Sequence, residues 1–157
     1  PVPTLLMPHT DDDWMKRALA LAAHCERLDE VPVGAVLVLD DAVIGGGWNQ
    51  PFSHHDPTAH AEVMALRDAG ERLGNYRLTG STLYVTLEPC LMCVGAIVHA
   101  RVARLVYGAA DPKVGAVASQ GSSLELPGLN HRVKVTGGVM AEQCSEVLKQ
   151  FFRARRG

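Results

Sequence analysis

The sequence contains no apolar run long enough to span a lipid bilayer. Its longest apolar stretch, Val33 to Leu39, falls well short of the roughly 20 residues that a membrane-spanning helix needs. The N-terminal segment, Pro1 to Thr10, has no basic region and only a short apolar run, so it lacks the pattern of a secretory signal. We therefore expect neither membrane insertion nor secretion.

The chain also lacks a net positive charge. It has 15 Lys and Arg residues against 17 Asp and Glu, a formal net charge of -2, which excludes a protein that coats nucleic acid by charge alone. The acidic run Asp11 to Asp13 is expected to complement the N-terminus of a helix. The basic residues near the C-terminus, Lys149, Arg153, Arg155 and Arg156, fit either a helix C-terminus or a phosphate-binding surface.

Cysteines are few, four in 157 residues. Cys90 and Cys93 form a C-x-x-C pair before a helical pattern, whereas Cys25 and Cys144 stand alone within helical patterns. Two disulfides are formally possible, but this distribution fits a reducing compartment better, so a cytoplasmic location is expected. Cys25 and Cys144 are interpreted as small buried apolar side chains.

A single globular domain over residues 1–157 is expected, because 47% of the residues are apolar and no repeat or low-complexity linker interrupts the chain. Helical and strand patterns alternate, which predicts an α/β sheet sandwiched by helices. Asp40-Asp41 predicts a tight hairpin turn, residues 49–58 a loop, and residues 109–130 an irregular surface segment. The predicted helices cover residues 14–28, 59–73, 91–100 and 140–151, and the predicted strands cover 33–39, 43–48, 83–87, 103–108 and 133–136.

The segment most indicative of chemistry is a split cluster, His60-Ala61-Glu62 followed by Pro89-Cys90-Leu91-Met92-Cys93. One imidazole and two thiolates are ligands that Zn²⁺ prefers, and three protein ligands leave a fourth tetrahedral position for water, as in catalytic sites. His60, Cys90 and Cys93 are therefore the expected zinc ligands. Glu62 is the residue left to move protons. Alone, C-x-x-C also fits a redox pair and H-x-E carries little information, but together they favour a metal site.

The helical context of the cluster supports this interpretation. Pro89 is suited to a helix start, and the positive end of the following helix would lower the pKa of both thiols. His60 and Glu62 fall in the first turn of a predicted helix, where two residues span about 200°, so we expect Glu62 to reach across beside the metal. Zinc lowers the pKa of a bound water to about 7, and Glu62 would accept that proton. These groups are suited to the hydrolytic removal of an amine from a heterocycle.

Further motifs beyond the cluster extend over nearly the whole chain. They are Val31 to Val36, Gly47-Trp48-Asn49, Asp56 to Glu62, Asn75-Tyr76-Arg77-Leu78, Thr82 to Cys90, Gly108 to Lys113, Asn130-His131-Arg132 and Phe151-Phe152-Arg153. With these motifs the chain resembles the bacterial tRNA-specific adenosine deaminases. The resemblance implies a homodimeric three-layer α/β/α sandwich of the cytidine-deaminase type, with a mixed five-stranded sheet. It also implies conversion of adenosine to inosine at the wobble position of a tRNA anticodon stem-loop, with one zinc ion per subunit.

The resemblance also implies roles for residues outside the cluster. Asn49 is expected to hydrogen-bond the purine ring, and the Ala61 backbone N–H to read the base or hold developing charge. Asp111 and Lys113 are expected to meet ribose and backbone groups of flanking nucleotides, although Val114 replaces the small or hydroxylated residue expected after Lys113. Three residues of the last helix are expected to line the RNA groove, where aromatic stacking is worth about 1–3 kcal/mol per base: Phe151, Phe152 and Arg153. For Phe151, a place in the core is the alternative.

Two alternatives stay open on the sequence. The zinc ligands and Glu62 equally suit a deaminase of a free nucleobase or nucleoside, such as guanine or cytidine. A structural zinc site or an RNA-binding module without turnover would need a fourth protein ligand, which His54 or His55 would have to supply. Otherwise these two histidines are expected to lie in the loop as candidates for substrate contact.

Overall fold

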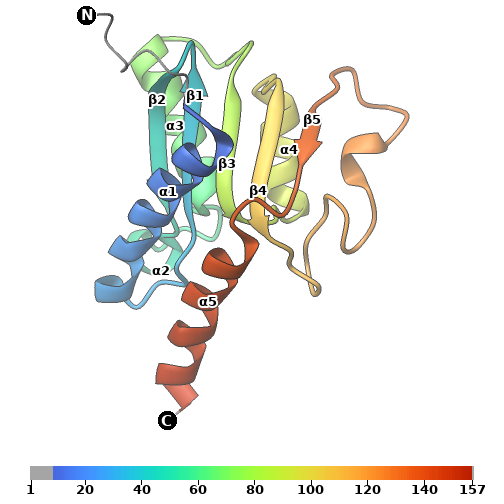
Figure 1. The fold of residues 1–157 in the computed structure, drawn as a ribbon. Coiled ribbons are helices and arrows are strands. Elements are labelled where there is room, and N and C mark those ends of the chain that lie inside the picture. The colour runs from blue at the N-terminus through green and yellow to red at the C-terminus, as the bar shows by residue number, and fades with distance from the viewer. Residues whose placement is uncertain (1–8, 157) are drawn as a thin grey trace, which may run out of the picture.

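A mixed five-stranded sheet forms the centre of the protein (Figure 1), whose computed structural model describes residues 9–156. The strands are β1 (Gly34–Leu39), β2 (Ala42–Trp48), β3 (Thr82–Leu87), β4 (Arg104–Ala109) and β5 (Lys134–Thr136). Their order is β2-β1-β3-β4-β5; β1 is antiparallel to both neighbours, and β4 is parallel to β3 and β5. The predicted mixed sheet is confirmed. Residues 1–8, most of the N-terminal segment Pro1 to Thr10 considered above, lie outside the described residues.

Helices cover both faces of this sheet, as Figure 1 shows. One face carries α1 (Asp11–Ala22) and α5 (Ala141–Arg156), and the other carries α3 (Ala61–Leu73) and α4 (Leu91–His99). The short helices are η2 (Ala23–Leu28), α2 (Pro51–His54) and η3 (Ser123–Glu125). This arrangement is the predicted three-layer α/β/α sandwich. No helix within residues 9–156 combines the length and apolarity needed to cross a membrane.

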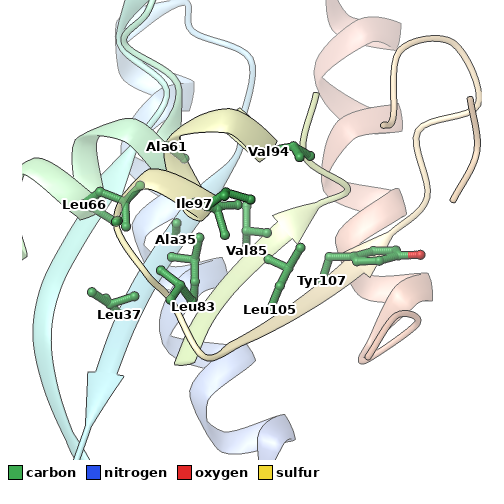
Figure 2. Close-up of a cluster of buried hydrophobic side chains, with 14 of the residues drawn as sticks. Ala35, Leu37, Ala61, Leu66, Leu83, Val85, Val94, Ile97, Leu105 and Tyr107 are labelled. Atoms are coloured by element: carbon green, nitrogen blue, oxygen red, sulfur yellow. The ribbon is translucent and has the colours of Figure 1, made fainter. Parts of the chain in front are cut away.

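Alternate strand residues fill two separate cores, because successive side chains of a strand point to opposite faces. On β3, Leu83 and Val85 belong to the cluster on the side of α3 and α4 (Figure 2), whereas Tyr84 belongs to the cluster beside α1. Ala61 is part of the first cluster although it precedes Glu62 directly. Core packing therefore fixes the start of α3 in place.

The β1–β2 hairpin brings β2 against α3. It turns at Asp40 and Asp41, as predicted, and both residues have positive φ, 51° and 57°, which a two-residue turn of type I′ requires. At Gly47 on β2, an added Cβ would lie 2.7 Å from the Ala61 carbonyl oxygen and 2.6 Å from the Ala65 nitrogen. Only glycine permits this approach, which presses β2 against the first turn of α3.

Two predictions of secondary structure are wrong, one for the end of a helix and one for a loop. The helix predicted over residues 14–28 ends at Ala22 and continues as a 3-10 helix, after which Asp29 adopts a left-handed conformation (φ 56°). The loop predicted over residues 49–58 contains α2, with Pro51 near its start, where the fixed φ of proline favours helix initiation.

The segment 109–130 is irregular, as predicted, but it is not confined to the surface. Ala116, Val117 and Leu124 are buried and join the core on the side of α3 and α4. The segment therefore forms part of the wall beside α4 rather than a solvent-exposed loop.

The acidic run starts α1, as predicted. Thr10 caps the helix and forms a reciprocal capping box with Asp13. Asp11 also accepts hydrogen bonds from the Arg104 guanidinium (2.9 and 2.7 Å) and the Tyr84 hydroxyl (2.8 Å), and the Arg104 bond lowers the pKa of Asp11. These contacts tie α1 to the sheet on the face away from α3 and α4.

Candidate metal centre and active site

The split cluster comes together where α3 and α4 begin. His60 is the N-cap residue of α3, Cys90 is the N-cap residue of α4, and Cys93 lies in the first turn of α4. The backbone of His60 is extended (φ -73°, ψ 156°), so the helical separation of about 200° expected between His60 and Glu62 does not apply. Pro89 precedes the α4 cap and does not occupy the first helical position.

The end of β2 is tied to the start of α3. The Ala61 N–H donates a hydrogen bond to Asn49 Oδ1 (3.0 Å), and Asn49 follows β2 directly. The Met64 N–H donates to the His60 carbonyl (3.0 Å), the first bond of the helix. The His60 N–H donates to the Thr58 carbonyl (2.8 Å), so backbone bonds hold His60 at the junction from both sides.

Three potential metal ligands converge at this junction. His60 Nδ1 lies 3.6 Å from Cys90 Sγ and 3.5 Å from Cys93 Sγ, and all three atoms lie within 4.8 Å of one another. A tetrahedral zinc ion, with Zn–N of about 2.0 Å and Zn–S of about 2.3 Å, separates its nitrogen and sulfur ligands by about 3.5 Å. Across residues 9–156, no fourth His, Cys, Asp or Glu joins this group. The spacing fits one zinc ion with three protein ligands.

The two thiols of the centre differ in charge. Hydrogen bonds from Cys93 and His60 lower the pKa of Cys90 to about 3, which stabilises its thiolate. The bond to Cys90 and burial raise the pKa of Cys93, and the bond to Cys90 raises the pKa of His60. Zinc binds deprotonated thiolates, so its binding releases a proton from Cys93.

Glu62 is the buried carboxyl beside this centre. It lies in the first turn of α3, is 4% exposed and interacts with the Cys93 thiol. Burial raises the pKa of Glu62 to about 7. A carboxyl with a near-neutral pKa can accept a proton and later return it, which is the property that the predicted proton transfer requires.

Two of the expected RNA-contacting residues lie on the segment after β4. The Asp111 carboxylate accepts the backbone N–H groups of Lys113 (3.1 Å) and Val114 (3.3 Å), which forms a tight turn. Lys113 and Val114 are exposed at the tip of this turn. Val114 also lines a cavity of about 420 Å³ together with the ligand Cys90, so the turn lies next to the metal centre.

His54 and His55 lie on the other loop, between β2 and α3. His54 ends α2 and His55 follows it with positive φ (49°), and both are exposed. Neither joins the group of three metal ligands. The fourth protein ligand that a structural zinc site needs is therefore not supplied by these histidines.

The three residues expected on α5 have different environments. Phe151 is buried, with the Arg155 guanidinium 3.6 Å from its ring centroid. Phe152 is 45% exposed and packs edge-to-face on Phe151, while Arg153 pairs with Glu146 (3.3 Å) on the surface. Phe152 and Arg153 are thus accessible, whereas Phe151 packs inside.

Two buried carboxylates near the site have no role in the sequence-based prediction. Glu30 accepts hydrogen bonds from the Phe52 and Ser53 N–H groups and so anchors α2. Glu88 holds the segment after β4; burial alone would raise its pKa, but hydrogen bonds from Ser119 and Ala118 outweigh burial and lower it to about 2. For Glu88, the signal in the sequence is an acidic residue that directly follows an apolar strand and directly precedes Pro89.

Comparison with known proteins agrees with this geometry. The family model of the cytidine and deoxycytidylate deaminase zinc-binding region matches residues 8–109. The tRNA-specific adenosine deaminase of Haemophilus influenzae is 54% identical over 148 residues, which cover 93% of this chain and 85% of the relative. That of Bacillus subtilis is 42% identical over 146 residues, which cover 93% of this chain and 91% of the relative.

Solved structures show the same likeness. One from a study of A-to-I editing by tRNA:A34 deaminases at the wobble position of transfer RNA has a TM-score of 0.84 and 47% identity, covering 86% of this chain and 98% of its own. A guanine deaminase from Bacillus subtilis has a TM-score of 0.64 and 34% identity, covering 94% of both chains. The matched zinc-binding region, the three-ligand geometry and these identities agree: the chain belongs to the zinc-binding cytidine and deoxycytidylate deaminase family, in the group of the tRNA-specific adenosine deaminases.

Proposed function

We propose that this protein hydrolyses adenosine to inosine at the wobble position of a tRNA anticodon, releasing ammonia. The observation that carries the proposal is the buried Glu62 beside three zinc-spaced ligands. The tRNA substrate follows from the 54% identity to the Haemophilus influenzae tRNA-specific adenosine deaminase. In this proposal residues 1–157 act as a single deaminase domain.

The proposed metal ligands are His60 Nδ1, Cys90 Sγ and Cys93 Sγ. When bound, zinc supplies a water whose pKa is lowered to about 7, and so a hydroxide nucleophile at neutral pH. The chain buries two groups of this centre: Cys93 is fully buried and Glu62 nearly so, whereas His60 and Cys90 are half-buried. Because Glu62 is buried, its carboxyl exchanges protons with the reacting groups rather than with bulk water.

Glu62 is the proposed catalytic acid and base. It takes the proton of the attacking water and delivers it to a ring nitrogen of the purine, which makes C6 electrophilic. After attack at C6, Glu62 moves a second proton to the exocyclic amine, which leaves as ammonia as the carbonyl of inosine forms. The net reaction consumes one water per amine released.

Asn49 is the proposed reader of the purine ring. Its Oδ1 already accepts the Ala61 N–H, so the amide NH₂ of Asn49 is the group left to donate to an acceptor on the base. The Ala61 N–H is expected from the sequence to contact the base. In the structure it donates to Asn49, so we propose that it orients Asn49 and contacts the base only when the Asn49 side chain releases it.

The surrounding surface is proposed to bind the flanking nucleotides. Lys113 and Asp111 on the turn after β4 would meet phosphate and ribose groups. On α5, Phe152 offers an exposed ring for base stacking and Arg153 a cation for phosphate. Phe151, being buried, is proposed to support Phe152 from beneath.

Equal concentrations of an anticodon stem-loop, free adenosine and guanine, incubated separately with zinc-loaded protein, test the substrate. We expect inosine in the stem-loop, with kcat/KM at least about 100-fold above that for free adenosine, because binding of the flanking nucleotides contributes to transition-state stabilisation. Mass spectrometry of the digested RNA measures it, and a stem-loop with guanosine at the wobble position is the control. Guanine turnover without inosine in RNA would instead support the guanine deaminase alternative, the activity of a Bacillus subtilis enzyme that is 34% identical to this chain.

We also propose a homodimer in the cytoplasm. The dimer is supported by an apolar groove of about 650 Å³ between α3 and α4, lined in part by Val63, Leu66 and Tyr76, which a second copy of the chain could cover. The location is supported by the four cysteines, which are all free thiols, as a reducing compartment favours. Sedimentation equilibrium at micromolar concentration is expected to give twice the chain mass of 16.9 kDa. A monomeric mass at that concentration would contradict the dimer, and recovery outside the cytosolic fraction would contradict the location.

A further inference from the structure

The second buried carboxylate near the metal centre, Glu88, is surrounded by donors from one segment. It follows β3 directly and is 2% exposed. Its Oε1 accepts the Asp111 N–H (3.1 Å) and the Ser119 hydroxyl, and its Oε2 accepts the N–H groups of Val117 (3.1 Å), Ala118 (2.9 Å) and Ser119 (3.0 Å). Five donors separated by up to eight positions in the chain thus converge on one carboxylate.

The segment wraps closely around that carboxylate. At Gly115 an added Cβ would lie 2.4 Å from Glu88 Cδ, so only glycine allows the chain to pass there. The segment between Asp111 and Ser119 contains turns but no helix or strand. Because no helix or strand shapes this segment, its path depends on its hydrogen bonds to Glu88 and on a backbone bond from the Gly115 N–H to the Asp111 carbonyl (2.9 Å).

The shape of this segment decides where the proposed RNA contacts lie. The Asp111 backbone is bonded to Glu88, and the Asp111 side chain forms the turn that exposes Lys113. Three residues beyond Lys113, the Ala116 N–H donates to the Pro89 carbonyl (2.9 Å), next to the ligand Cys90. The segment therefore forms one wall of the cavity of about 420 Å³, and the start of α4 forms another.

We propose that Glu88 is a positioning residue for substrate binding: it shapes residues 111–119 so that Asp111 and Lys113 meet the nucleotides beside the target base. This inference rests on the proposed function. The Glu88 carboxylate is occupied by the segment and does not join the metal ligands, so it acts through Asp111 and Lys113 and not on the reacting atoms. Loss of Glu88 therefore weakens RNA binding more than it slows the chemical step.

The variant Glu88→Gln tests this in the zinc-loaded, full-length protein. Glutamine keeps the size but replaces one acceptor oxygen with an NH₂ group that faces N–H donors. We expect KM for the anticodon stem-loop to rise about 10- to 100-fold, the range for lost hydrogen bonds to a charged group, and kcat to fall less than about threefold. The zinc content should stay at one per chain, and Glu88→Asp, which keeps the charge, should recover part of the affinity.

A double-mutant cycle distinguishes positioning from a general structural role. Lys113→Ala should raise KM in the native background but change it little when combined with Glu88→Gln, because the contact is already misplaced. If Glu88→Gln does not fold, Ser119→Ala removes only the hydroxyl donor and should raise KM a few-fold, about the effect of one hydrogen bond. Thermal unfolding identifies which variant is folded and therefore which one is measured.

The inference is overturned if Glu88→Gln folds and keeps KM within about threefold of the native value or, where Ser119→Ala is measured in its place, if KM does not change. It is also overturned if kcat falls as much as KM rises, or if the effects of Glu88→Gln and Lys113→Ala on KM add independently. Failure of the proposed function has a different signature, because the native protein itself would then form no inosine in the stem-loop. In that case the KM for guanine, whose binding needs no flanking nucleotides, should be unchanged by Glu88→Gln if the segment binds only RNA.

Discussion

Glu62→Ala is expected to lower kcat for inosine formation in an anticodon stem-loop by about 10²- to 10⁴-fold, the range that a positioned general acid and base contributes. The physical reason is that Glu62 is the buried carboxyl beside the ligand group, with a pKa raised by burial to about 7. Without it, no buried carboxyl beside the ligand group carries the protons of the attacking water and of the departing amine. Single-turnover kinetics with saturating protein measures the effect.

Zinc content and RNA affinity are the controls for this result. Glu62 does not join the ligand group, so Glu62→Ala should keep one zinc per chain by atomic emission and bind the stem-loop as the native protein does. Glu62→Gln, which keeps the side-chain volume, should be equally inactive and so exclude a cavity effect. Native-like turnover in either variant would show that another group moves the protons.

Comparison with the Glu88 variant sharpens the assignment of Glu62. Both residues are buried acids close to the metal ligands, at 4% and 2% exposure. Glu62 has a raised pKa and faces the ligands, whereas Glu88 has a lowered pKa and faces five donors. We therefore expect opposite kinetic signatures, with kcat lost in Glu62→Gln and KM raised in Glu88→Gln. Burial alone does not identify a catalytic carboxyl; the groups that surround it do.

The features that the sequence predicts well depend on local pattern. The five strands follow from short apolar runs, and the Asp40-Asp41 turn follows from residues that tolerate positive φ. The ligand group follows from residue type and spacing, since His60, Cys90 and Cys93 meet at the starts of two helices that each follow a predicted strand or loop. None of these predictions requires knowledge of a distant contact.

The features that the sequence does not predict depend on contacts between distant residues. Glu88 bonds to donors 23 to 31 positions away, and that contact draws Val117 into the core although its segment has the composition of a surface loop. Asp11 and Arg104 are 93 positions apart, so the acidic run indicates a helix start but not an ion pair. His60 precedes the first helical residue of α3 and has an extended backbone. The Asn49 side chain accepts the N–H of the next residue, Ala61, which lies 12 positions from Asn49, and so fixes where the helix starts.

Cys93→Ala is expected to lower zinc affinity by more than about 100-fold, since loss of groups that merely support a ligand already costs about 10- to 100-fold. Cys93 is buried and lies 3.5 Å from His60 Nδ1. Among residues 9–156, His60 and Cys90 are the other two members of the group, so the variant keeps two of its three protein ligands. Inosine formation should fall with the zinc content. Cys144→Ala is the matched control, because Cys144 is an equally buried thiol outside the group and should keep one zinc per chain.

The pH dependence of zinc affinity tests the same centre independently. The pKa of Cys93 is raised in the metal-free protein, so at neutral pH this thiol is protonated and must lose its proton when zinc binds. Protons therefore compete with zinc, and affinity should fall as the pH is lowered from 8 to 6, by about tenfold per pH unit for each proton released. Competition with a chromophoric chelator measures the affinity, and calorimetry in two buffers counts the protons. Native zinc content in Cys93→Ala, or affinity independent of pH, would show that the metal is held by other ligands.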